Sequence, residues 1–322
     1  MMQQMLLGYG PSGYKIDDVF SVDTYTGNSS TQTITNDIDL SGKGGLVWIK
    51  SRTGGMLSHQ LATTVGGSNN YLNTNSNGHY SNFSSTTKIT SFNSNGFSLG
   101  SNSGVNGGDN YVAWTFRKAS EFFDIVTWSG NGTSGRTISH NLGAVPGMIF
   151  VKCTSDNRTW RIYHTYLGNT RARPMTTSAA ETNSAFWNNT TPTSSVFTLG
   201  NDNDVNATGK DYIAYLFAED TSDIIKCGGY VGNGGFTNTI TTGFQTQFLF
   251  VNRSELGFSN FQLWDTTRGM QQFSSKRLEA NTTDSEFNTS SGNFYSTSTG
   301  FVANNTYNVQ NRKYMYMAIA AP

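Results

Sequence analysis

The sequence predicts an all-β protein made of three tandem antiparallel β-sandwich modules of the jelly-roll or lectin-like kind. Three observations lead to this class. Related segments recur three times at intervals of about one hundred residues. Short runs rich in β-branched and aromatic residues alternate with clusters of Asn, Gly and Ser. The composition is low in charge but rich in glycine and aromatic residues, as expected for strands joined by many turns.

The repeat sets the domain organisation. Each copy opens with an aromatic-x-Gly-Asn segment (residues 25–28, 128–131 and 230–233) and closes with an apolar run (residues 111–116, 212–217 and 314–319). Its period exceeds the ~20–50 residues of solenoid units and matches an independently folding domain. We predict an arm over residues 1–17 and modules over residues 18–117, 118–219 and 220–322. The short junctions at 117–121 and 218–223 predict a semi-fixed relation between modules.

The strand predictions rest on apolar runs bounded by turn-forming residues. The predicted strands include residues 46–50, 89–92, 111–116, 148–152, 212–217, 248–252 and 314–319. Clusters at 66–70, 73–78 and 102–109 predict turns, because Asn and Gly tolerate positive φ. No segment shows a helical stripe of useful length.

Composition excludes several classes of protein. Charged residues make up 13% of the chain and the formal net charge is zero, so no basic surface is expected to bind nucleic acid. Aromatic residues reach 13%, which argues against disorder. No apolar run approaches the ~18 residues of a membrane span. We therefore predict neither nucleic-acid binding nor membrane insertion.

The N-terminus does not resemble a signal peptide, because it lacks a basic start and its apolar stretch is short. The chain is expected to be made in a cytoplasm and released by something other than secretion. Residues 1–17 have no counterpart in the repeats, and an apolar terminal segment is ordered only when something holds it. We predict an anchoring arm that docks onto another chain through Met1, Met5, Leu6, Leu7 and Tyr9.

The residues with metal or redox chemistry are few and scattered. The four histidines lie at unrelated positions in the repeats, so surface or strand positions are favoured over a metal or acid–base site (His59, His79, His140 and His164). Cys153 and Cys227 are also non-equivalent, so buried free thiols are favoured over a disulfide. We predict no metal and no cofactor.

Residues 200–209 resemble the start of a calcium loop, since Asp202, Asp204 and Asn206 alternate. However, Ile213 occupies the place of the bidentate acid, so a hairpin turn is favoured. No nucleophile elbow, phosphate loop or zinc helix motif occurs. Because no pair of carboxylates recurs between the repeats either, we predict that the protein is not an enzyme.

Aromatic residues in irregular stretches suggest a binding function. Flat rings beside amides and hydroxyls suit sugars, although aromatic residues also serve as core in small modules. Core positions are favoured for Trp160 and Trp264. The candidate carbohydrate-binding residues are Tyr163, Tyr166, Trp187 and Phe261.

Several segments taken together carry a family resemblance, among them residues 44–52, 91–100, 129–147 and 261–269. The three copies resemble a module found repeatedly in tail-fibre-like and other virion proteins of marine tailed phages, especially cyanophages. The resemblance spans residues 18–322. It implies a phage structural protein located in the virion, made in the host cytoplasm and released by lysis. Such proteins commonly assemble as trimers, so a homo-oligomer is expected, with a trimer favoured.

The predicted function is attachment to the host surface, through carbohydrate, as part of a tail fibre or similar outward-facing appendage. The N-terminal arm would dock onto other tail or capsid proteins of the virion. The alternative is a capsid or tail decoration protein whose role is purely structural. What the copies share is turn chemistry and closing strands, so any specificity is expected in the loops where they differ.

Overall fold

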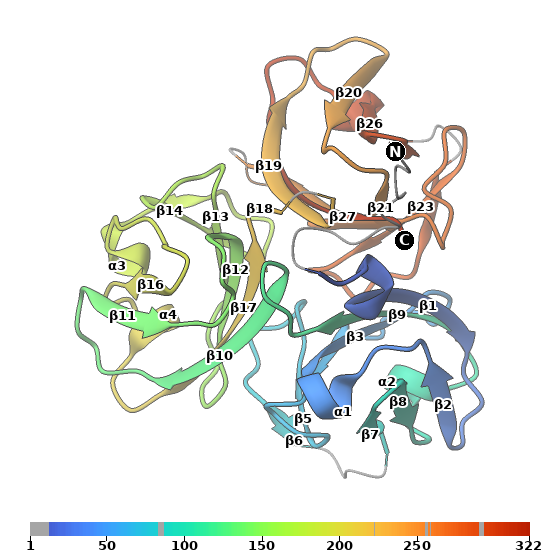
Figure 1. Ribbon diagram of the computed structural model, residues 1–322, viewed down its shortest axis with the longest axis horizontal. Helices are drawn as coiled ribbons and strands as arrows, with labels where there is room; N and C mark the ends of the chain where they lie inside the picture. Colours follow the sequence, from blue (N-terminus) through green and yellow to red (C-terminus); the bar gives the residue numbers. More distant parts are fainter. Residues whose placement is uncertain (1–12, 83–86, 222, 255–256, 258, 290–292) are drawn as a thin grey trace, which may run out of the picture.

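The computed structural model describes residues 13–322 except 83–86, 222, 255–256, 258 and 290–292. We refer to residues 18–117, 118–219 and 220–322 as repeats 1, 2 and 3. The chain forms three lobes around a common centre, one lobe for each repeat (Figure 1). Each repeat contributes a large antiparallel sheet near the centre and a small sheet toward the outside. The predicted all-β, antiparallel class is confirmed.

The three large sheets share one order of six strands, and repeat 3 adds the short strand β18 at one edge. In repeat 1 the order is β1 (Phe20–Thr26), β9 (Asn110–Arg117), β3 (Gly45–Ser51), β4 (Gln60–Thr63), β5 (Asn70–Leu72), β6 (Ser81–Asn82). In repeat 2 it is β10 (Phe123–Ser129), β17 (Asp211–Ala218), β12 (Pro146–Cys153), β13 (Arg161–His164), β14 (Arg171–Pro174), β15 (Glu181–Thr182). In repeat 3 it is β18 (Asp220–Thr221), β19 (Ile225–Val231), β27 (Lys313–Ala320), β21 (Thr246–Arg253), β22 (Gln262–Asp265), β23 (Ser275–Glu279), β24 (Phe287–Thr289).

The small sheets pair strands from the start and the later part of each repeat. They comprise β2 (Gln32–Thr35), β8 (Gly96–Leu99) and β7 (Ile89–Asn93); β11 (Arg136–Ser139) and β16 (Val196–Leu199); and β20 (Thr237–Thr241), β26 (Gly300–Asn304) and β25 (Phe294–Thr297). All seven strand-like runs predicted from the sequence lie within these strands or those of the large sheets.

Among the described residues, helical structure is confined to single turns. The α-helices are α1 (Leu40–Lys43), α2 (Ser103–Asn106), α3 (Ser184–Trp187) and α4 (Asn203–Asn206), and the 3-10 turns are η1 (Ile16–Asp18) and η2 (Asn305–Tyr307). The turn predicted at 102–109 and the hairpin predicted at 200–209 contain α2 and α4 instead. In both, a side chain caps the turn: Asn102 accepts the Gly104 N–H, and Asp202 accepts the Asp204 N–H.

The central strands of the large sheets are buried on both faces. Every residue of β3 and of β12 is buried. Because successive side chains of a strand point to opposite faces, β3 serves two cores. Val47 and Ile49 pack in a cluster with the small sheet of repeat 1, whereas Leu46 and Trp48 belong to a core shared with the other repeats.

This shared core joins all three repeats. Between ring centroids, Phe116 of repeat 1 lies 5.6 Å from Phe217 of repeat 2 and 6.1 Å from Phe248 of repeat 3. Phe150 of repeat 2 lies 5.4 Å from Phe250 of repeat 3. The module boundaries predicted at 117–118 and 219–220 are therefore connections of the chain, while the hydrophobic core continues across them.

Polar contacts close the three repeats into a ring. Each contact joins a strand of one large sheet to a neighbouring repeat, in or near β5, β14 or β23. Repeat 1 thus contacts repeat 2, repeat 2 contacts repeat 3, and repeat 3 contacts repeat 1. The three contacts are Lys152 Nζ to the Asn77 carbonyl (2.7 Å), Arg173 Nε to Asn252 Oδ1 (2.9 Å) and Lys50 Nζ to the Thr283 carbonyl (3.0 Å).

The repeated aromatic-x-Gly-Asn segment makes the same contacts in each repeat. Its asparagine faces a second asparagine that follows the small sheet. The side-chain Nδ2 of this second asparagine donates to Oδ1 of the motif asparagine at 3.1, 3.2 and 2.7 Å in repeats 1, 2 and 3. The Oδ1 of the second asparagine in turn accepts the backbone N–H of the motif asparagine. The pairs, in chain order, are Asn28–Asn106, Asn131–Asn206 and Asn233–Asn308.

The neighbouring glycine and aromatic residue complete this contact. A Cβ on Gly27, Gly130 or Gly232 would lie 1.8, 2.1 or 2.0 Å from a backbone oxygen, so only glycine fits. The opening aromatic ring stacks on the tyrosine that begins the closing strand, at 5.3, 5.5 and 4.8 Å between centroids. The repeated motif is thus part of the scaffold, and the residues that differ between copies lie elsewhere.

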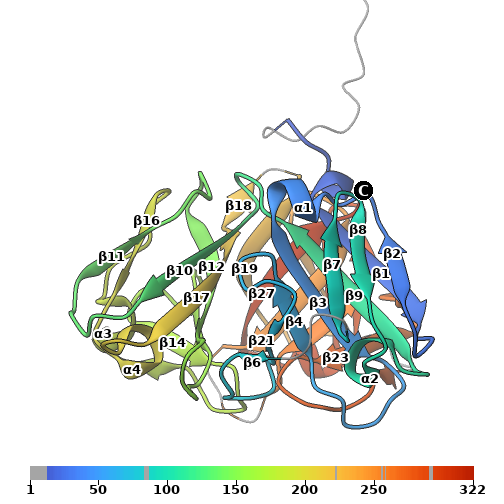
Figure 2. The same ribbon diagram turned by 90° about the horizontal axis from the view of Figure 1, so that it is seen from below.

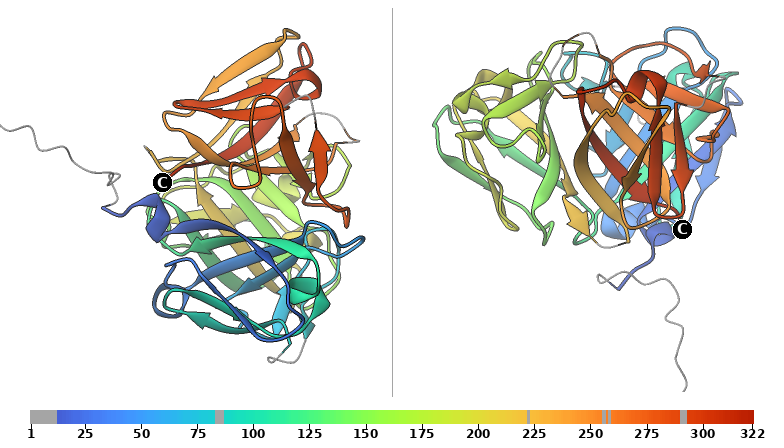
Figure 3. Two further views of the ribbon diagram at one scale, coloured as in Figure 1. Left: turned by 90° about the vertical axis from the view of Figure 1, so that its right-hand side faces the viewer. Right: turned by 90° about the horizontal axis from the view of Figure 1, so that it is seen from above.

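The C-terminus and three of the helical turns lie at opposite ends of the molecule, whereas α1 lies at the same end as the C-terminus (Figure 2). Figures 2 and 3 show the C-terminus beside the first described residues of the chain. The helical turns α2, α3 and α4 lie at the other end (Figure 2).

The histidines are more buried than the sequence suggests. His79 is exposed and His164 lies in β13, which agrees with the prediction of surface or strand positions. The prediction is wrong for His59 and His140, which are buried outside strands. Two of these side chains join repeats: His59 Nε2 lies 3.0 Å from the Glu279 carbonyl, and His164 Nε2 lies 3.1 Å from the Tyr316 carbonyl.

Acid is expected to destabilise the fold through these buried histidines. Burial lowers the pKa of His164 from 6.5 to about 4. Between these values the unfolded chain binds a proton that the folded chain does not, so the free energy of unfolding falls as the pH falls through this window. The loss is on the order of 3 kcal/mol. Urea denaturation at pH 7.5 and pH 4.5 measures it.

The matched variants are His164→Gln, which removes the titrating group, and His79→Gln at the exposed position. We expect the stability difference between the two pH values to shrink in the His164 variant and to match the wild type in the His79 variant. An unchanged pH difference in the His164 variant would contradict this assignment.

Candidate functional site

The predicted sugar-binding aromatics are mostly core residues. Tyr163 and Trp187 are each 2% exposed and Phe261 is fully buried. The Tyr163 and Trp187 rings pack edge to face at 5.9 Å, and Phe261 packs 5.4 Å from Phe250. Tyr166 is partly buried and packs against the shared core. The prediction of exposed sugar-binding rings is therefore wrong for Tyr163, Trp187 and Phe261. Both faces of the large sheets are covered by hydrophobic cores, and aromatic side chains fill these cores.

Other sequence predictions have clear outcomes. Trp160 and Trp264 are core residues as predicted, at 1% and 0% exposure. Cys153 and Cys227 are buried free thiols, also as predicted. The proposed anchoring residues Met1, Met5, Leu6, Leu7 and Tyr9 lie outside the described residues.

The described part of the predicted arm packs on its own chain. Ile16 is buried in the shared core, and the Tyr14 hydroxyl donates a hydrogen bond to the Ser120 carbonyl. Residues 14 and 16 are therefore held against repeats 1 and 2 of the same chain.

The acids of the calcium-like loop are used internally. Asp202 caps α4, and Asp204 Oδ2 lies 2.8 Å from Arg161 Nε of the same repeat. Within the described ranges, no group of three or more His, Cys, Asp or Glu side chains is arranged to hold a metal ion.

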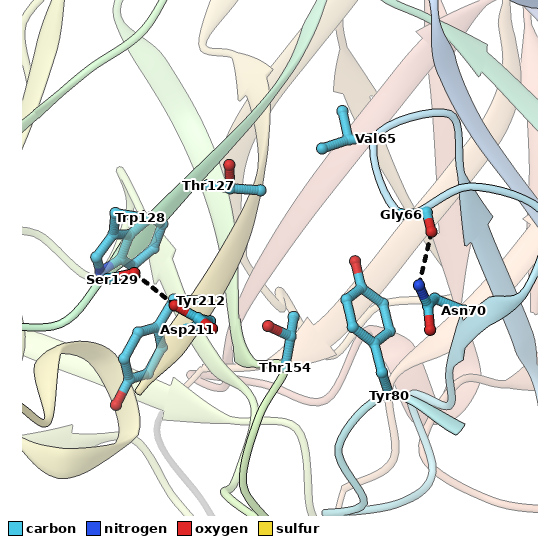
Figure 4. A pocket seen from close by; sticks show the side chains of 10 residues that line it. All are labelled: Val65, Gly66, Asn70, Tyr80, Thr127, Trp128, Ser129, Thr154, Asp211 and Tyr212. Carbon is cyan, nitrogen blue, oxygen red and sulfur yellow. Dashed lines mark hydrogen bonds between the residues drawn. The ribbon is translucent and has the colours of Figure 1, made fainter. Parts of the chain in front are cut away.

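A cleft of about 350 Å³ lies between repeats 1 and 2 (Figure 4). Repeat 1 contributes the turn between β4 and β5, together with Tyr80. Repeat 2 contributes the ends of β10, β12 and β17, which reach the cleft as Thr127 to Ser129, Thr154 and Asp211. The cleft exists only because the two repeats are held together.

Aromatic side chains stand on both sides of the cleft. Tyr80 is partly buried, and its ring faces across the cleft toward Trp128 and Tyr212 (Figure 4). Its backbone N–H donates to the Thr154 carbonyl at 3.2 Å, which ties the backbone at this residue to repeat 2. Burial raises the pKa of the Tyr80 phenol, which therefore stays neutral at physiological pH. Trp128 stacks on Tyr212 and presents only 8% of its surface.

Polar groups line the space between these rings. Asp211, Ser129 and Thr127 are exposed, and Ser129 Oγ donates to Asp211 Oδ1 at 2.5 Å. This bond leaves the second carboxylate oxygen of Asp211 available as an acceptor. Asn70 Nδ2 donates to the Gly66 carbonyl at 2.8 Å, so its Oδ1 is the group left for a ligand.

The lining residues of the cleft can bind a ligand through hydrogen bonds and through contacts with aromatic rings. A serine nucleophile needs an adjacent base, and the described lining residues include no histidine or lysine. A hydroxyl-rich ligand would donate to the Asp211 and Asn70 oxygens and lay its C–H surface on the Tyr80 ring. This combination of rings with a few placed polar groups is typical of small-molecule sites.

Sequence reasoning missed both Tyr80 and Asp211. Tyr80 follows an Asn/Ser-rich stretch that reads as a turn, and Asp211 directly precedes the repeated closing strand. One signal was available for Asp211: its equivalents in the other repeats are Asn110 and Lys313, so the position varies while its neighbours repeat.

Within the described residues, no helix is long and apolar enough to cross a membrane. A family model described as "Domain of unknown function (DUF7483)" matches residues 15–322, a span that takes in all three repeats. No curated protein matches the chain. No solved structure matches it either.

Proposed function

We propose that this chain, which belongs to the DUF7483 family, is a virion structural protein of a tailed bacteriophage that attaches to the host surface through carbohydrate. In this proposal it faces outward as part of a tail fibre or similar appendage. Each repeat is a two-sheet β-sandwich module, and the N-terminal arm, residues 1–17, docks onto other virion proteins. The cleft between repeats 1 and 2 is the observation that carries the carbohydrate assignment.

The chemistry of the cleft suits a neutral, hydroxyl-rich ligand. Its single carboxylate and its amide oxygen accept hydrogen bonds from hydroxyl groups, while the Tyr80 ring offers an apolar face. The chain as a whole has no net charge, so long-range attraction of a strongly charged partner is not expected. Recognition would then depend on contacts made inside the cleft.

The scaffold supports attachment by keeping the cleft preformed. Repeats 1 and 2 share the Phe116–Phe217 contact and the Lys152–Asn77 hydrogen bond, so the two walls need little ordering when a ligand binds. Preorganisation of this kind reduces the cost of association. Several copies of the protein on one virion would add avidity.

The test measures binding of the purified chain to surface polysaccharide from marine cyanobacteria, with Tyr80→Leu and Asp211→Asn as cleft variants. Each variant is expected to weaken binding about tenfold, through loss of the ring contact or of a charge-assisted hydrogen bond. Tyr295→Leu is the matched control, since Tyr295 is a partly buried tyrosine of repeat 3 outside the cleft. If the wild type does not bind, or if both cleft variants bind as tightly as the wild type, the proposal fails.

The second candidate is a capsid or tail decoration protein with a structural role only. Exposed phenylalanines of repeat 3 favour it, because Phe236 and Phe273 are 79% and 74% exposed. Exposed rings of this size suit burial against neighbouring subunits. Replacing both by serine would prevent incorporation into virions under this alternative, whereas the attachment proposal assigns them no role in sugar binding.

A further inference from the structure

A second pocket lies within repeat 3, between strands of its large sheet and the turn η2. It has a volume of about 210 Å³ and is bordered by Arg253, Asn260, Gln262, Glu279 and Tyr307. Arg253 ends β21, Gln262 begins β22 and Glu279 ends β23, so three adjacent strands supply the polar groups. The pocket is separate from the cleft between repeats 1 and 2.

Gln262 presents an acceptor that nothing in the described structure satisfies. Its side chain is 5% exposed, and its Nε2 donates to Glu279 Oε1 at 3.1 Å. That bond fixes the orientation of the amide, because the reverse orientation would set two acceptors against each other. Gln262 Oε1 is left buried without a hydrogen-bond partner among the described residues. A buried acceptor without a partner is costly, so a donor from outside the chain is expected here.

The other repeats provide an internal comparison. Gln60 in β4 and Arg161 in β13 occupy the same register position as Gln262 in β22. Gln60 Oε1 accepts a hydrogen bond from Lys88 Nζ at 2.7 Å. Arg161 pairs with Asp204 at 2.8 Å and with a second acid. In repeats 1 and 2, side chains of the same repeat therefore satisfy the polar group at this register position. In repeat 3 the equivalent acceptor, Gln262 Oε1, has no such partner among the described residues and borders a pocket.

The charges around the pocket indicate what kind of ligand fits. Glu279 accepts from Asn260 Nδ2 at 2.5 Å and from Gln262, and it forms an ion pair with Arg277 at 3.2 Å. Its charge is thus already compensated. Arg253, in contrast, is partly exposed and forms no ion pair with any described residue. The uncompensated charge is positive, which favours an anionic group on the ligand.

We propose that this pocket binds a single carboxylate-bearing sugar of the uronic acid class. The carboxylate pairs with the Arg253 guanidinium, and a ring hydroxyl donates to Gln262 Oε1. The Tyr307 ring forms the apolar wall for the C–H face of the sugar. The pocket volume lies below the ~300–1,000 Å³ of sites for drug-sized ligands, which suits one sugar ring.

An amino acid is the less suitable ligand. It also carries a carboxylate, but its ammonium group would need a free carboxylate, and Glu279 is already engaged by three side chains. A neutral hydroxyl donor matches the single open acceptor better. This inference does not depend on the cleft, because the two sites share no residues.

Titration calorimetry with sodium D-glucuronate tests the proposal, with D-glucose, sodium acetate and L-alanine as comparison ligands. We expect the full chain to bind glucuronate at least about tenfold more tightly than each of the other three, since only glucuronate offers both the anion and the hydroxyls. Arg253→Gln is expected to weaken glucuronate binding about tenfold or more. Arg312→Gln is the matched control, because Arg312 is exposed in the same repeat and lies outside the pocket.

Three results would overturn the proposal. The first is absence of glucuronate binding at tens of millimolar, a range chosen because single-site sugar affinities near 1 mM correspond to only about 4 kcal/mol. The second is binding of acetate or L-alanine as tight as that of glucuronate. The third is loss of glucuronate binding in the cleft variant Tyr80→Leu, which would move the ligand to the other site. Retained glucuronate binding in that variant keeps this inference separate from the proposed function of the cleft.

Discussion

Replacing Asp265 by alanine is expected to lower the free energy of unfolding by about 3–5 kcal/mol. The Asp265 and Arg268 side chains are both fully buried, and Asp265 Oδ2 lies 2.6 Å from Arg268 Nε. Asp265 Oδ1 also accepts the backbone N–H of Arg268 at 2.8 Å. Removing the carboxylate leaves the buried guanidinium without the closer of its two carboxylate partners, since Glu286 lies 3.1 Å away.

The position of this pair makes the effect global. Asp265 Oδ2 accepts a hydrogen bond from Trp114 Nε1 of repeat 1 at 3.0 Å. Arg268 also pairs with Glu286, which in turn forms a two-pronged pair with Arg52 of repeat 1. These contacts join the last repeat to the first. Loss of Asp265 is therefore expected to weaken the contact that closes the ring.

Urea denaturation followed by tryptophan fluorescence measures the loss. The matched control is Asp220→Ala, since Asp220 is an aspartate of repeat 3 that is 53% exposed and pairs with Lys226 at 3.0 Å. An exposed pair of this kind contributes about 1 kcal/mol or less. Equal destabilisation by the two variants would show that the buried network does not carry the stability assigned to it.

The strands were predictable because their signals are local. Runs such as Tyr111 to Phe116 combine β-branched and aromatic residues and end at glycine-rich or polar turns. The helical turns α2 and α4 were not predicted, because four residues are too few to show a helical period. Their capping residues, Asn102 and Asp202, also serve as ordinary turn formers.

The arrangement of the repeats depends on contacts that a sequence pattern does not reveal. In the sequence, Asp265 and Arg268 look like ordinary polar residues of a turn. Their burial depends on contacts such as the hydrogen bond from Trp114, which is distant in the sequence. Tyr80 and Asp211 meet at the cleft although they belong to different repeats. The aromatic residues predicted to bind sugar lie in stretches that look irregular in the sequence, but the central strands β3 and β12 are buried on both faces, and most of these rings fill the cores.

Replacing Phe116 by alanine is expected to cost about 3–5 kcal/mol and to weaken all three repeats together. Phe116 is fully buried in β9 of repeat 1. Its ring lies 5.6 Å from Phe217 of repeat 2 and 6.1 Å from Phe248 of repeat 3. The cavity left by the substitution would open onto both neighbours, so stability is lost where the three large sheets meet.

Hydrogen exchange resolved by peptide distinguishes a shared core from three independent modules. In the Phe116 variant we expect lower protection in β17 and β21 as well as in β9, because the cavity borders strands of all three repeats. Phe97→Ala is the matched control, since Phe97 is equally buried but belongs to the separate cluster within repeat 1. That variant is expected to lower protection mainly in repeat 1. If the Phe116 variant also affects repeat 1 alone, the repeats fold as separate modules, and the cleft between repeats 1 and 2 loses the rigid support on which a preformed binding site depends.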